Sequence, residues 1–561
     1  MQKRWSVKDT DDEIVDQLQD GLGINRIFCQ LLVARGIDTF DKAKEFFRMD
    51  ASQLNDPFLM KGMNTAVERI RVAIDKGQNI LLYGDYDVDG TTSVALVYSF
   101  FKHFYDNISF YIPNRFSEGY GLSEKGIEHA VNKEVNLIIT LDCGIKSIEL
   151  VAKAKEQGID TIICDHHLPG EDLPNAFAIL NPKQADCEYP YKELCGCGVG
   201  YKLVAAYGQR YEISQDLINE HLDLLACAIA ADIVPITAEN RTLAYLGLKK
   251  ANENPSLPIK ALKELGDVRK DLSIRDLVFI IGPRVNAAGR MDDATKAVEL
   301  FIEKEESNAQ ALAKVLDESN KQRVQIDKNI TEEATALLQE AHDHSTVVYN
   351  RNWHKGVVGI VASRLIEKKY RPTIVLTESN GMVTGSARSI HGFNLFEGLS
   401  DCSDLLENFG GHYFAAGLTM KEENLPEFKE RFDKIVAERV TEDQFIPEIK
   451  IDAEISFEHL GFNFLKIIEE FAPHGPQNLS PIFITKNVTD HKQLSKVVND
   501  KHIRFVVRQW DEAIIFNGIG FHMADKIKVV KEQQTFDIVY HIERNVWRER
   551  ESLQIRALDI R

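Results

Sequence analysis

The sequence of 561 residues has no long hydrophobic run and no cysteine pair at metal-binding spacing. No stretch approaches the ~18 apolar residues that a membrane-spanning helix needs. The charged start MQKRWSVKDTDDE lacks the apolar segment of a signal peptide. None of the eight cysteines forms a C-x-x-C pair, and Cys195 and Cys197 are too close together for the usual zinc spacing. We therefore expect a cytoplasmic protein, without a membrane span, whose cysteines are reduced and structural.

An excess of positive charge is also missing. Lys and Arg number 67 and Asp and Glu 86, which gives a formal charge of −19. This balance argues against nonspecific binding of nucleic acid by the whole surface. It leaves room for a local basic channel and for an acidic metal cluster.

Residues 290–355 contain neither glycine nor proline, and much of 303–342 has a helical, mostly polar composition. Such a helix more often bridges two domains than lies in one core. Before it, short apolar runs alternate with helical segments such as 91–104, which predicts a doubly wound parallel sheet. After it come a second α/β unit and, from residue 437, alternating β segments that predict a small barrel or sandwich.

These patterns predict an α/β multidomain protein, in keeping with its length. The expected parts are an N-terminal helical segment (1–50), a domain with the parallel sheet (51–302), a connecting helix (303–343), a second α/β domain (344–436) and a C-terminal β-barrel domain (437–561).

Three aspartates stand two residues apart in YGDYDVDGTT, at positions 85, 87 and 89, directly after an apolar run. The spacing matches the opening of an EF-hand loop, but Leu96 occupies the twelfth position, where a bidentate Glu is required. Asp87 also fits the nucleophile of haloacid-dehalogenase-type phosphatases. A solvated acidic turn is a further interpretation of this segment alone.

Other predicted elements end in similar side chains. The run VNLIITL is followed by Asp142, DTIIC by Asp165-His166-His167, and an apolar helix-like run by Asp232. The carboxyl ends of parallel strands line one crevice, so these side chains should converge. Carboxylates mixed with imidazole suit Mn²⁺ or Mg²⁺ more than zinc. Two such ions sharing a carboxylate are suited to the hydrolysis of phosphoesters.

Together, GDYDVDG, LDCG, DHH and the later Asp232 resemble the motifs of the DHH phosphoesterase superfamily. The segments DPFLMKGMNTAVERI (56–70), IPNRFSEGYGL (112–122), GPRVNAAGRM (282–291) and GGHYFAAG (410–417) resemble its RecJ branch, the 5′→3′ exonucleases specific for single-stranded DNA. The resemblance runs from about residue 50 to the C-terminus. It implies a catalytic DHH domain, a DHHA1 domain carrying GGHYFAAG, and a C-terminal oligonucleotide-binding (OB) fold.

The resemblance also implies roles for single residues around two divalent ions, Mn²⁺ or Mg²⁺. The implied metal ligands are Asp85, Asp87, Asp89, Asp142, His167 and Asp232. The implied division has Asp85 and Asp87 on one ion, Asp89, His167 and Asp232 on the other, and a bridging Asp142. His166 is expected to contact the scissile phosphate or to protonate the leaving oxygen.

Several residues outside this cluster are candidates for holding phosphates. The resemblance suggests that Arg115, Ser386 and Arg388 bind the 5′-phosphate, and that Gly410, Gly411 and His412 contact the DNA backbone. Arg284, Asn286 and Arg290 lie in a segment with several glycines where guanidinium and backbone could meet a phosphate. In the predicted barrel, Trp547 lies among arginines 544, 548 and 550, and Trp510 follows Arg504 and Arg508. We expect the basic side chains to line one narrow channel that excludes duplex DNA.

The predicted function is metal-dependent 5′→3′ hydrolysis of single-stranded DNA to mononucleotides by a monomer. By resemblance, it serves DNA repair and recombination, together with a single-strand-binding protein and a RecQ-type helicase. Two alternatives stay open. One is a DHH–DHHA1 phosphodiesterase for short RNA or cyclic dinucleotides, which the long helix and the barrel disfavour. The other is a non-catalytic scaffold that binds single strands, which the complete ligand set disfavours.

Overall fold

The computed structural model describes residues 3–339, 343–510, 512–548 and 550–561. The chain forms two compact units. The smaller is built mainly from Leu316–Ile449, and the larger from Ser6–Gly289, Asp293–Val315 and Lys450–Arg561. Among the described residues, every helix is too short or too polar to cross a membrane. All eight cysteines are buried and free.

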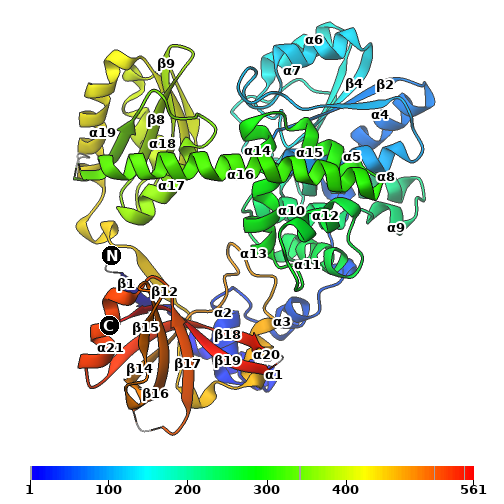
Figure 1. Cartoon of the computed structure of the whole chain (residues 1–561). Coiled ribbons are helices and arrows are strands. Elements are labelled where there is room, and N and C mark those ends of the chain that lie inside the picture. Colours follow the sequence, from blue (N-terminus) through cyan, green and yellow to red (C-terminus); the bar gives the residue numbers. More distant parts are fainter. Residues whose placement is uncertain (1–2, 340–342, 511, 549) are drawn as a thin grey trace. The chain divides into compact units, whose positions relative to one another are not determined.

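A five-stranded parallel sheet forms the first part of the larger unit (Figure 1). Its strands run in the order β3-β2-β4-β5-β6, with every neighbouring pair parallel. The apolar runs are buried because both faces are covered by helices, as in other doubly wound sheets. The strands are β2 (Asn79–Gly84), β3 (Ile108–Tyr111), β4 (Val135–Leu141), β5 (Asp160–Cys164) and β6 (Ala178–Leu180).

The two faces of this sheet are covered by different helices. Helices α6 (Glu124–Asn132) and α7 (Ile148–Glu156) pack on the face that carries Leu81 and Tyr83. Helices α5 (Val88–Lys102) and α8 (Gly196–Arg210) cover the other face. The chain leaves β2 for β3 on one side and returns to β4 on the other. The carboxyl ends of β2 and β4 therefore form the switch point at which ligands bind in open parallel sheets.

Further helices complete this part of the larger unit. They are α4 (Met63–Asp75), α9 (Gln215–Ile218), α10 (Leu222–Ala231), α11 (Ala238–Glu253), α12 (Leu257–Leu265), α13 (Ile274–Asp276), α14 (Gly282–Met291) and α15 (Thr295–Ile302). The last two residues of α14, Arg290 and Met291, belong to the smaller unit. The long helix that the sequence predicts is α16 (Glu306–Ala336), which is followed by a 3-10 turn at Leu337–Gln339. Its residues are divided between the two units.

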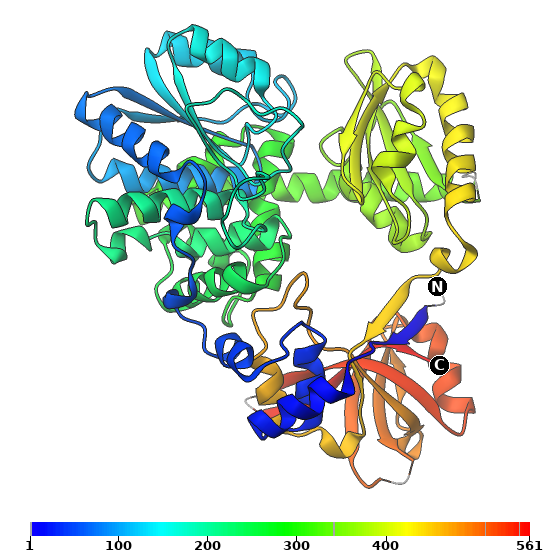
Figure 2. The ribbon, with the colours of Figure 1, turned by 180° about the vertical axis from the view of Figure 1, so that it is seen from behind.

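The smaller unit contains a mixed five-stranded sheet in the order β10-β11-β9-β8-β7, where only β7 and β8 are parallel. Helices α17 (Val358–Lys368), α18 (Leu395–Ser400) and α19 (Leu425–Arg439) accompany it (Figure 2). The strands are β7 (Thr346–Tyr349), β8 (Thr373–Ser379), β9 (Met382–Arg388), β10 (Asn408–Gly411) and β11 (Ala415–Met420). This is the second α/β unit that the sequence predicts.

The C-terminal strands close into a barrel, because β14 pairs with both β18 and β16 in a ring that runs β14-β18-β19-β17-β16. Helices α20 (Phe462–Glu469) and α21 (Ile527–Glu532) accompany the barrel. The strands are β13 (Ala453–Glu454), β14 (Phe483–Asp490), β15 (Lys496–Val498), β16 (His502–Gln509), β17 (Ile515–Gly520), β18 (Phe536–Trp547) and β19 (Arg550–Ile560).

The N-terminal helices share the hydrophobic core of this barrel domain, which the sequence does not predict. Helices α1 (Asp12–Leu22), α2 (Arg26–Val33) and α3 (Phe40–Phe47) contribute buried residues to one cluster with the C-terminal strands. The rings of Phe28 and Phe464 lie 4.9 Å apart between their centroids. Segments at opposite ends of the sequence therefore fold together.

Candidate active site

The three aspartates of YGDYDVDGTT lie where β2 passes into α5. Asp87 is the N-cap of α5, and its side chain accepts a hydrogen bond from Gly90 N at 3.1 Å. The helix therefore begins at Val88, so the predicted start near Thr91 is wrong by about one turn. Asp89 consequently lies in the first turn. It is buried and accepts hydrogen bonds from Gly196 N at 2.6 Å and Cys197 N at 2.7 Å, at the N-terminus of α8.

The other predicted carboxylates reach the same place from different elements. Asp142 follows β4 with a φ of 64°, and Asp232 is the C-cap of α10. Between them lies His166, the second residue after β5. Its Nε2 atom is 3.2 Å from Asp142 Oδ1, 3.5 Å from Asp232 Oδ2 and 3.8 Å from Asp89 Oδ2. The convergence that the strand ends predict is thus present.

Three groups in this cluster have the spacing of metal ligands. Within each group, one candidate ligand atom per residue lies within 4.8 Å of the others. The groups are Asp85, Asp87 and Asp142; Asp89, His166 and Asp232; and Asp142, His166 and His167. Because Asp142 and His166 each occur in two of them, the groups form one continuous site.

Burial and mutual repulsion both disfavour the ionised form of the carboxylates in the site. Burial, followed by the charge of Asp87, raises the pKa of Asp85 well above its ordinary value and that of Asp89 to about 6. Burial and the neighbouring aspartates likewise raise the pKa values of Asp142 and Asp232. A divalent cation would offset both effects.

Several buried atoms of the site make no hydrogen bond within the described residues: Asp85 Oδ1, Asp142 Oδ1, and both ring nitrogens of His166. Burial, followed by the charge of His167, lowers the pKa of His166 to about 3. Its ring is therefore neutral near pH 7 and can offer a nitrogen lone pair to a metal. Buried polar groups without partners are rare, so these atoms fit the ligand set of bound metal ions.

His167 differs from His166 in its partners. Its Nδ1 atom lies 2.7 Å from Asp165 Oδ1, and its ring also contacts the hydroxyl of Tyr120. Burial alone would lower the pKa of His167, but the hydrogen bond and charge of Asp165 outweigh it and raise that pKa. The predicted division put His167 with Asp89 and Asp232, whereas His166 occupies that position here, because Asp165 holds the His167 ring. Asp165 and Tyr120 are site residues that sequence reasoning missed, although Asp165 belongs to the quoted DHH motif.

Comparison with known proteins identifies the family. Family models match residues 79–229 (DHH family, N-terminal domain), 342–438 (DHHA1 domain) and 451–559 (RecJ OB domain). The "Single-stranded-DNA-specific exonuclease RecJ" of Bacillus subtilis is 37% identical over 562 residues, which cover 99% of this chain and 70% of that protein. The chain belongs to the RecJ family. The Escherichia coli protein of the same description is 34% identical, and the match covers 88% of this chain and 89% of that protein.

Solved RecJ structures have a similar fold. A structure described as exonuclease RecJ bound to manganese is 29% identical, with a TM-score of 0.61, over 70% of this chain and 98% of that one. RecJ from Thermus thermophilus in complex with Mn²⁺ superposes with a TM-score of 0.86 over 100% of this chain and 79% of that one, at 24% identity. The predicted RecJ membership and the predicted fold class, with DHH, DHHA1 and OB domains, are confirmed.

Residues of the RecJ-like segment GPRVNAAGRM lie on helix α14 and support the acidic loop. Asn286 Oδ1 accepts a hydrogen bond from Val88 N at 3.2 Å. A Cβ atom on Gly289 would lie 2.6 Å from Tyr86 O, so only glycine allows this approach. Arg284 donates to Ile280 O at 2.6 Å, and Arg290 donates to Gly356 O at 3.0 Å within the smaller unit.

Arg115 approaches the acidic loop from the segment after β3. Its guanidinium lies over the ring of Tyr86, 4.9 Å from the centroid. Tyr86 in turn meets Tyr120 edge to face. The predicted phosphate ligand is thus connected to the metal cluster by two aromatic rings.

The remaining RecJ-type phosphate candidates converge in the smaller unit. Arg388 Nη1 donates to Ser386 Oγ at 2.8 Å on β9. In the strand register, Gly410 of β10 faces Gly417 of β11, which faces Ser386. Gly411 has a φ of 151°, and a Cβ there would lie 2.3 Å from Ala415 O. Together with His412, whose N donates to Ala415 O at 2.8 Å, these residues form a tight strand end beside the Ser386–Arg388 pair.

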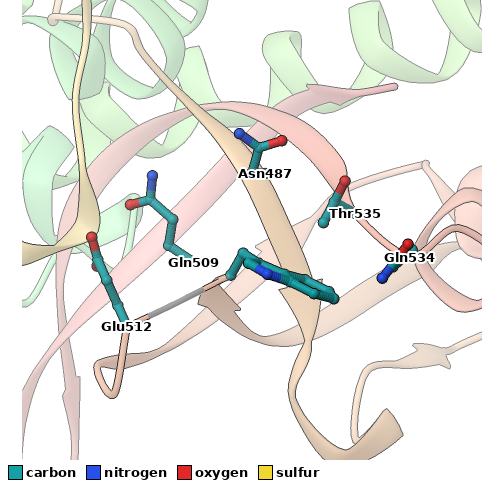
Figure 3. Close-up of a pocket in the computed structure, with 6 residues that line it drawn as sticks. Asn487, Gln509, Glu512, Gln534 and Thr535 are labelled. Atoms are coloured by element: carbon teal, nitrogen blue, oxygen red, sulfur yellow. The ribbon is translucent and has the colours of Figure 1, made fainter.

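The RecJ OB domain carries a polar pocket around Trp510 (Figure 3). The cavity measures about 390 Å³, and Trp510 is 43% exposed. The other lining residues are Asn487, Gln509, Glu512, Gln534 and Thr535. Arg544 is bonded to Glu469 and Glu551. Trp547 ends β18, and its side chain lies outside the described part of the structure.

Proposed function

We propose that this protein is a metal-dependent 5′→3′ exonuclease that hydrolyses single-stranded DNA to mononucleotides. The observation that carries the proposal is the buried cluster of carboxylates and one neutral imidazole at the switch point of the sheet. Relatives described as single-stranded-DNA-specific exonucleases match nearly the whole chain, which supports this substrate over a dinucleotide.

The cluster has ligands for two divalent ions, Mn²⁺ or Mg²⁺. Asp85, Asp87 and Asp142 would hold one, and Asp142 together with Asp89, His166 and Asp232 the other. When bound, the ions supply activation of a water molecule and stabilisation of the leaving oxygen. Hydrogen bonds from α8 favour the ionised form of Asp89 and fix its direction, which prepares this side chain as a ligand.

His167 is a better candidate than His166 for contact with the scissile phosphate or for proton donation to the leaving oxygen. Its ring is held by Asp165 at the edge of the cluster, and its raised pKa favours the protonated form. A protonated imidazole can donate a hydrogen bond to the scissile phosphate or a proton to the leaving oxygen. This exchanges the roles that the sequence suggests for His166 and His167.

We assign the grip on the DNA to three groups of residues. The 5′-phosphate is bound by the hydroxyl of Ser386 and the guanidinium of Arg388. The following phosphates contact the strand end formed by Gly410, Gly411 and His412, where glycine lets the backbone come close. Arg115 serves a phosphate beside the metal cluster. In the OB domain, Trp510 and Trp547 stack on bases. A narrow basic channel that admits only single strands remains part of the proposal.

We extend the proposal to the setting of the reaction. The protein acts as a monomer in the cytoplasm, in DNA repair and recombination. A single-strand-binding protein and a RecQ-type helicase supply its substrate. These statements follow from the family resemblance.

The decisive experiment uses end-labelled single strands with Mn²⁺ and compares wild type with Asp142→Ala. The expected result is release of mononucleotides from the 5′ end by wild type and at least 1000-fold slower release by the variant. Asp267→Asn, at an exposed position, is the control that should keep full activity. Binding of DNA without release would favour the scaffold, and cleavage of dinucleotides alone would favour the other phosphodiesterase.

A further inference from the structure

The turn that carries Asp232 is held in an unfavourable backbone conformation. The next residue, Ile233, has a φ of 60° and is 65% exposed. A β-branched residue rarely adopts this conformation, and such strain persists only where surrounding contacts determine the backbone. Because the Ile233 side chain is exposed, those contacts come from its neighbours in the chain: Asp232 N donates to Ala228 O at 2.9 Å before it, and further contacts follow after it.

One of these contacts comes from the barrel domain. The loop 471–479 (FAPHGPQNL) joins α20 to β14, and its Pro476 O accepts a hydrogen bond from Ile236 N at 2.8 Å. Ile236 is fully buried, and a Cβ atom on Gly475 would lie 2.4 Å from its Cγ1 atom. The loop thus docks four residues after Asp232, through a close approach that requires glycine. Both segments belong to the larger unit.

The loop is itself firmly fixed. Asn478 is buried, and its amide donates to Phe471 O and Pro473 O, both at 2.9 Å. Arg35 Nε donates to Asn478 Oδ1 at 2.9 Å. Arg241, on the helix that follows the Asp232 turn, donates to Ala472 O at 2.9 Å. The loop therefore grips the corner between α10 and α11 at two points, Ile236 and Arg241.

We propose that loop 471–479 is a positioning element for Asp232, through which the barrel domain fixes one carboxylate of the metal cluster. The inference rests on the proposed function, in which Asp232 is a metal ligand. Contacts around a metal ligand fix the direction of its side chain before the ion binds. We expect loop 471–479 to do this for Asp232.

The test compares two glycine variants of the full chain. Gly475→Ala places a methyl group against Ile236, whereas Gly461→Ala, in the same domain, has no atom within 4 Å of the added Cβ. In Gly475→Ala, hydrogen exchange of segment 232–237 should accelerate, and Mn²⁺ affinity measured by calorimetry should fall about tenfold. Gly461→Ala should behave as wild type. Activity lost by Gly475→Ala should return at high Mn²⁺ concentration.

A third variant separates positioning from simple damage. Ile236→Ala removes the Cγ1 atom, so adding Gly475→Ala to it should have little further effect on Mn²⁺ affinity. Faster exchange of 232–237 with unchanged Mn²⁺ affinity would overturn the proposal, as would unchanged exchange. If wild type and Asp232→Asn bind Mn²⁺ equally, Asp232 is not a metal ligand, and the proposed metal site itself is contradicted.

Discussion

Replacing Asp142 by asparagine should stabilise the metal-free protein while it abolishes hydrolysis. The substitution removes one charge from a buried acidic cluster and keeps the shape of the side chain. Asparagine tolerates the left-handed conformation of this position, where φ is 64°. Asp142 Oδ1 makes no hydrogen bond within the described residues, so an amide there breaks none.

The magnitude follows from the neighbouring Asp89, whose pKa is raised to about 6 by burial first and by Asp87 next. Since a tenfold change in proton affinity corresponds to about 1.4 kcal/mol, keeping Asp89 ionised at pH 7 costs the folded state about 3 kcal/mol. Asp142 is one of the charges in the same cluster, and its own pKa is raised by burial and by Asp89. Its neutralisation should therefore recover about 1–3 kcal/mol.

The gain depends on pH in a defined direction. A carboxyl group whose pKa is raised by folding contributes stability below the pKa of the unfolded state, about 3.8, and loses it as the pH rises through about 6. The pKa of Asp142 is likewise raised, so the difference between Asp142→Asn and wild type should grow as the pH rises and be small near pH 4. Bound Mn²⁺ should reverse the order, because it stabilises only the folded state that holds it.

Thermal unfolding in EDTA and in Mn²⁺ measures these effects. Each kcal/mol should shift the midpoint by about 2–4 °C for a domain of this size. Asp267→Asn is the matched control, since Asp267 also has a positive φ of 50° but lies exposed and away from the cluster. If Asp142→Asn melts below wild type in EDTA at pH 7.5, mutual repulsion of the carboxylates does not destabilise the metal-free protein.

Three further predictions concern other parts of the molecule. Arg388→Ala should raise KM about tenfold for a 5′-phosphorylated strand, and an equal effect on a 5′-hydroxyl strand would contradict its assigned role. Lys202→Met should cost about 3–5 kcal/mol in thermal unfolding, because it leaves the buried Glu239 carboxylate without its cationic partner, and adding Glu239→Gln should recover part of the loss. Burial first, and nearby arginines next, lower the pKa of His474 to about 4. Wild type should therefore lose stability from pH 6.5 to 4 as the unfolded chain takes up a proton, and His474→Gln should lose less over the same range.

The sequence predicts the parallel sheet and the location of the acid cluster well, for a physical reason. Buried parallel strands must be apolar on both faces, so runs such as 135–141 are easy to recognise. Strand ends of one sheet edge must meet, so the residues after them could be grouped without coordinates. The start of α5 could also have been found, because Asp87 before an apolar helix is a favoured N-cap.

Other features depend on contacts that no local pattern encodes. Two adjacent histidines come shortly after β5, and the sequence does not tell which contact each makes: the His167 ring lies against Asp165, whereas His166 meets Asp142, Asp232 and Asp89. Helices α1 to α3 have apolar faces in the sequence, but their local pattern does not indicate that they pack against a barrel about 400 residues later in the chain. Long-range packing of this kind is fixed by shape and not by periodicity.

The glycines around the cluster change how the family motifs are understood. Added Cβ atoms would lie 2.5 Å from Asp85 O at Gly90, 2.5 Å from Asp142 Cβ at Gly196, and 2.6 Å from Tyr86 O at Gly289. Each glycine comes from a different segment, and each lets backbone pass directly behind an acidic residue or its neighbour. The glycine-rich segment GPRVNAAGRM, which suggests a phosphate grip by composition, therefore also packs against the acidic loop. What these motifs have in common is the close approach that brings five carboxylates and two histidines together in the candidate metal site.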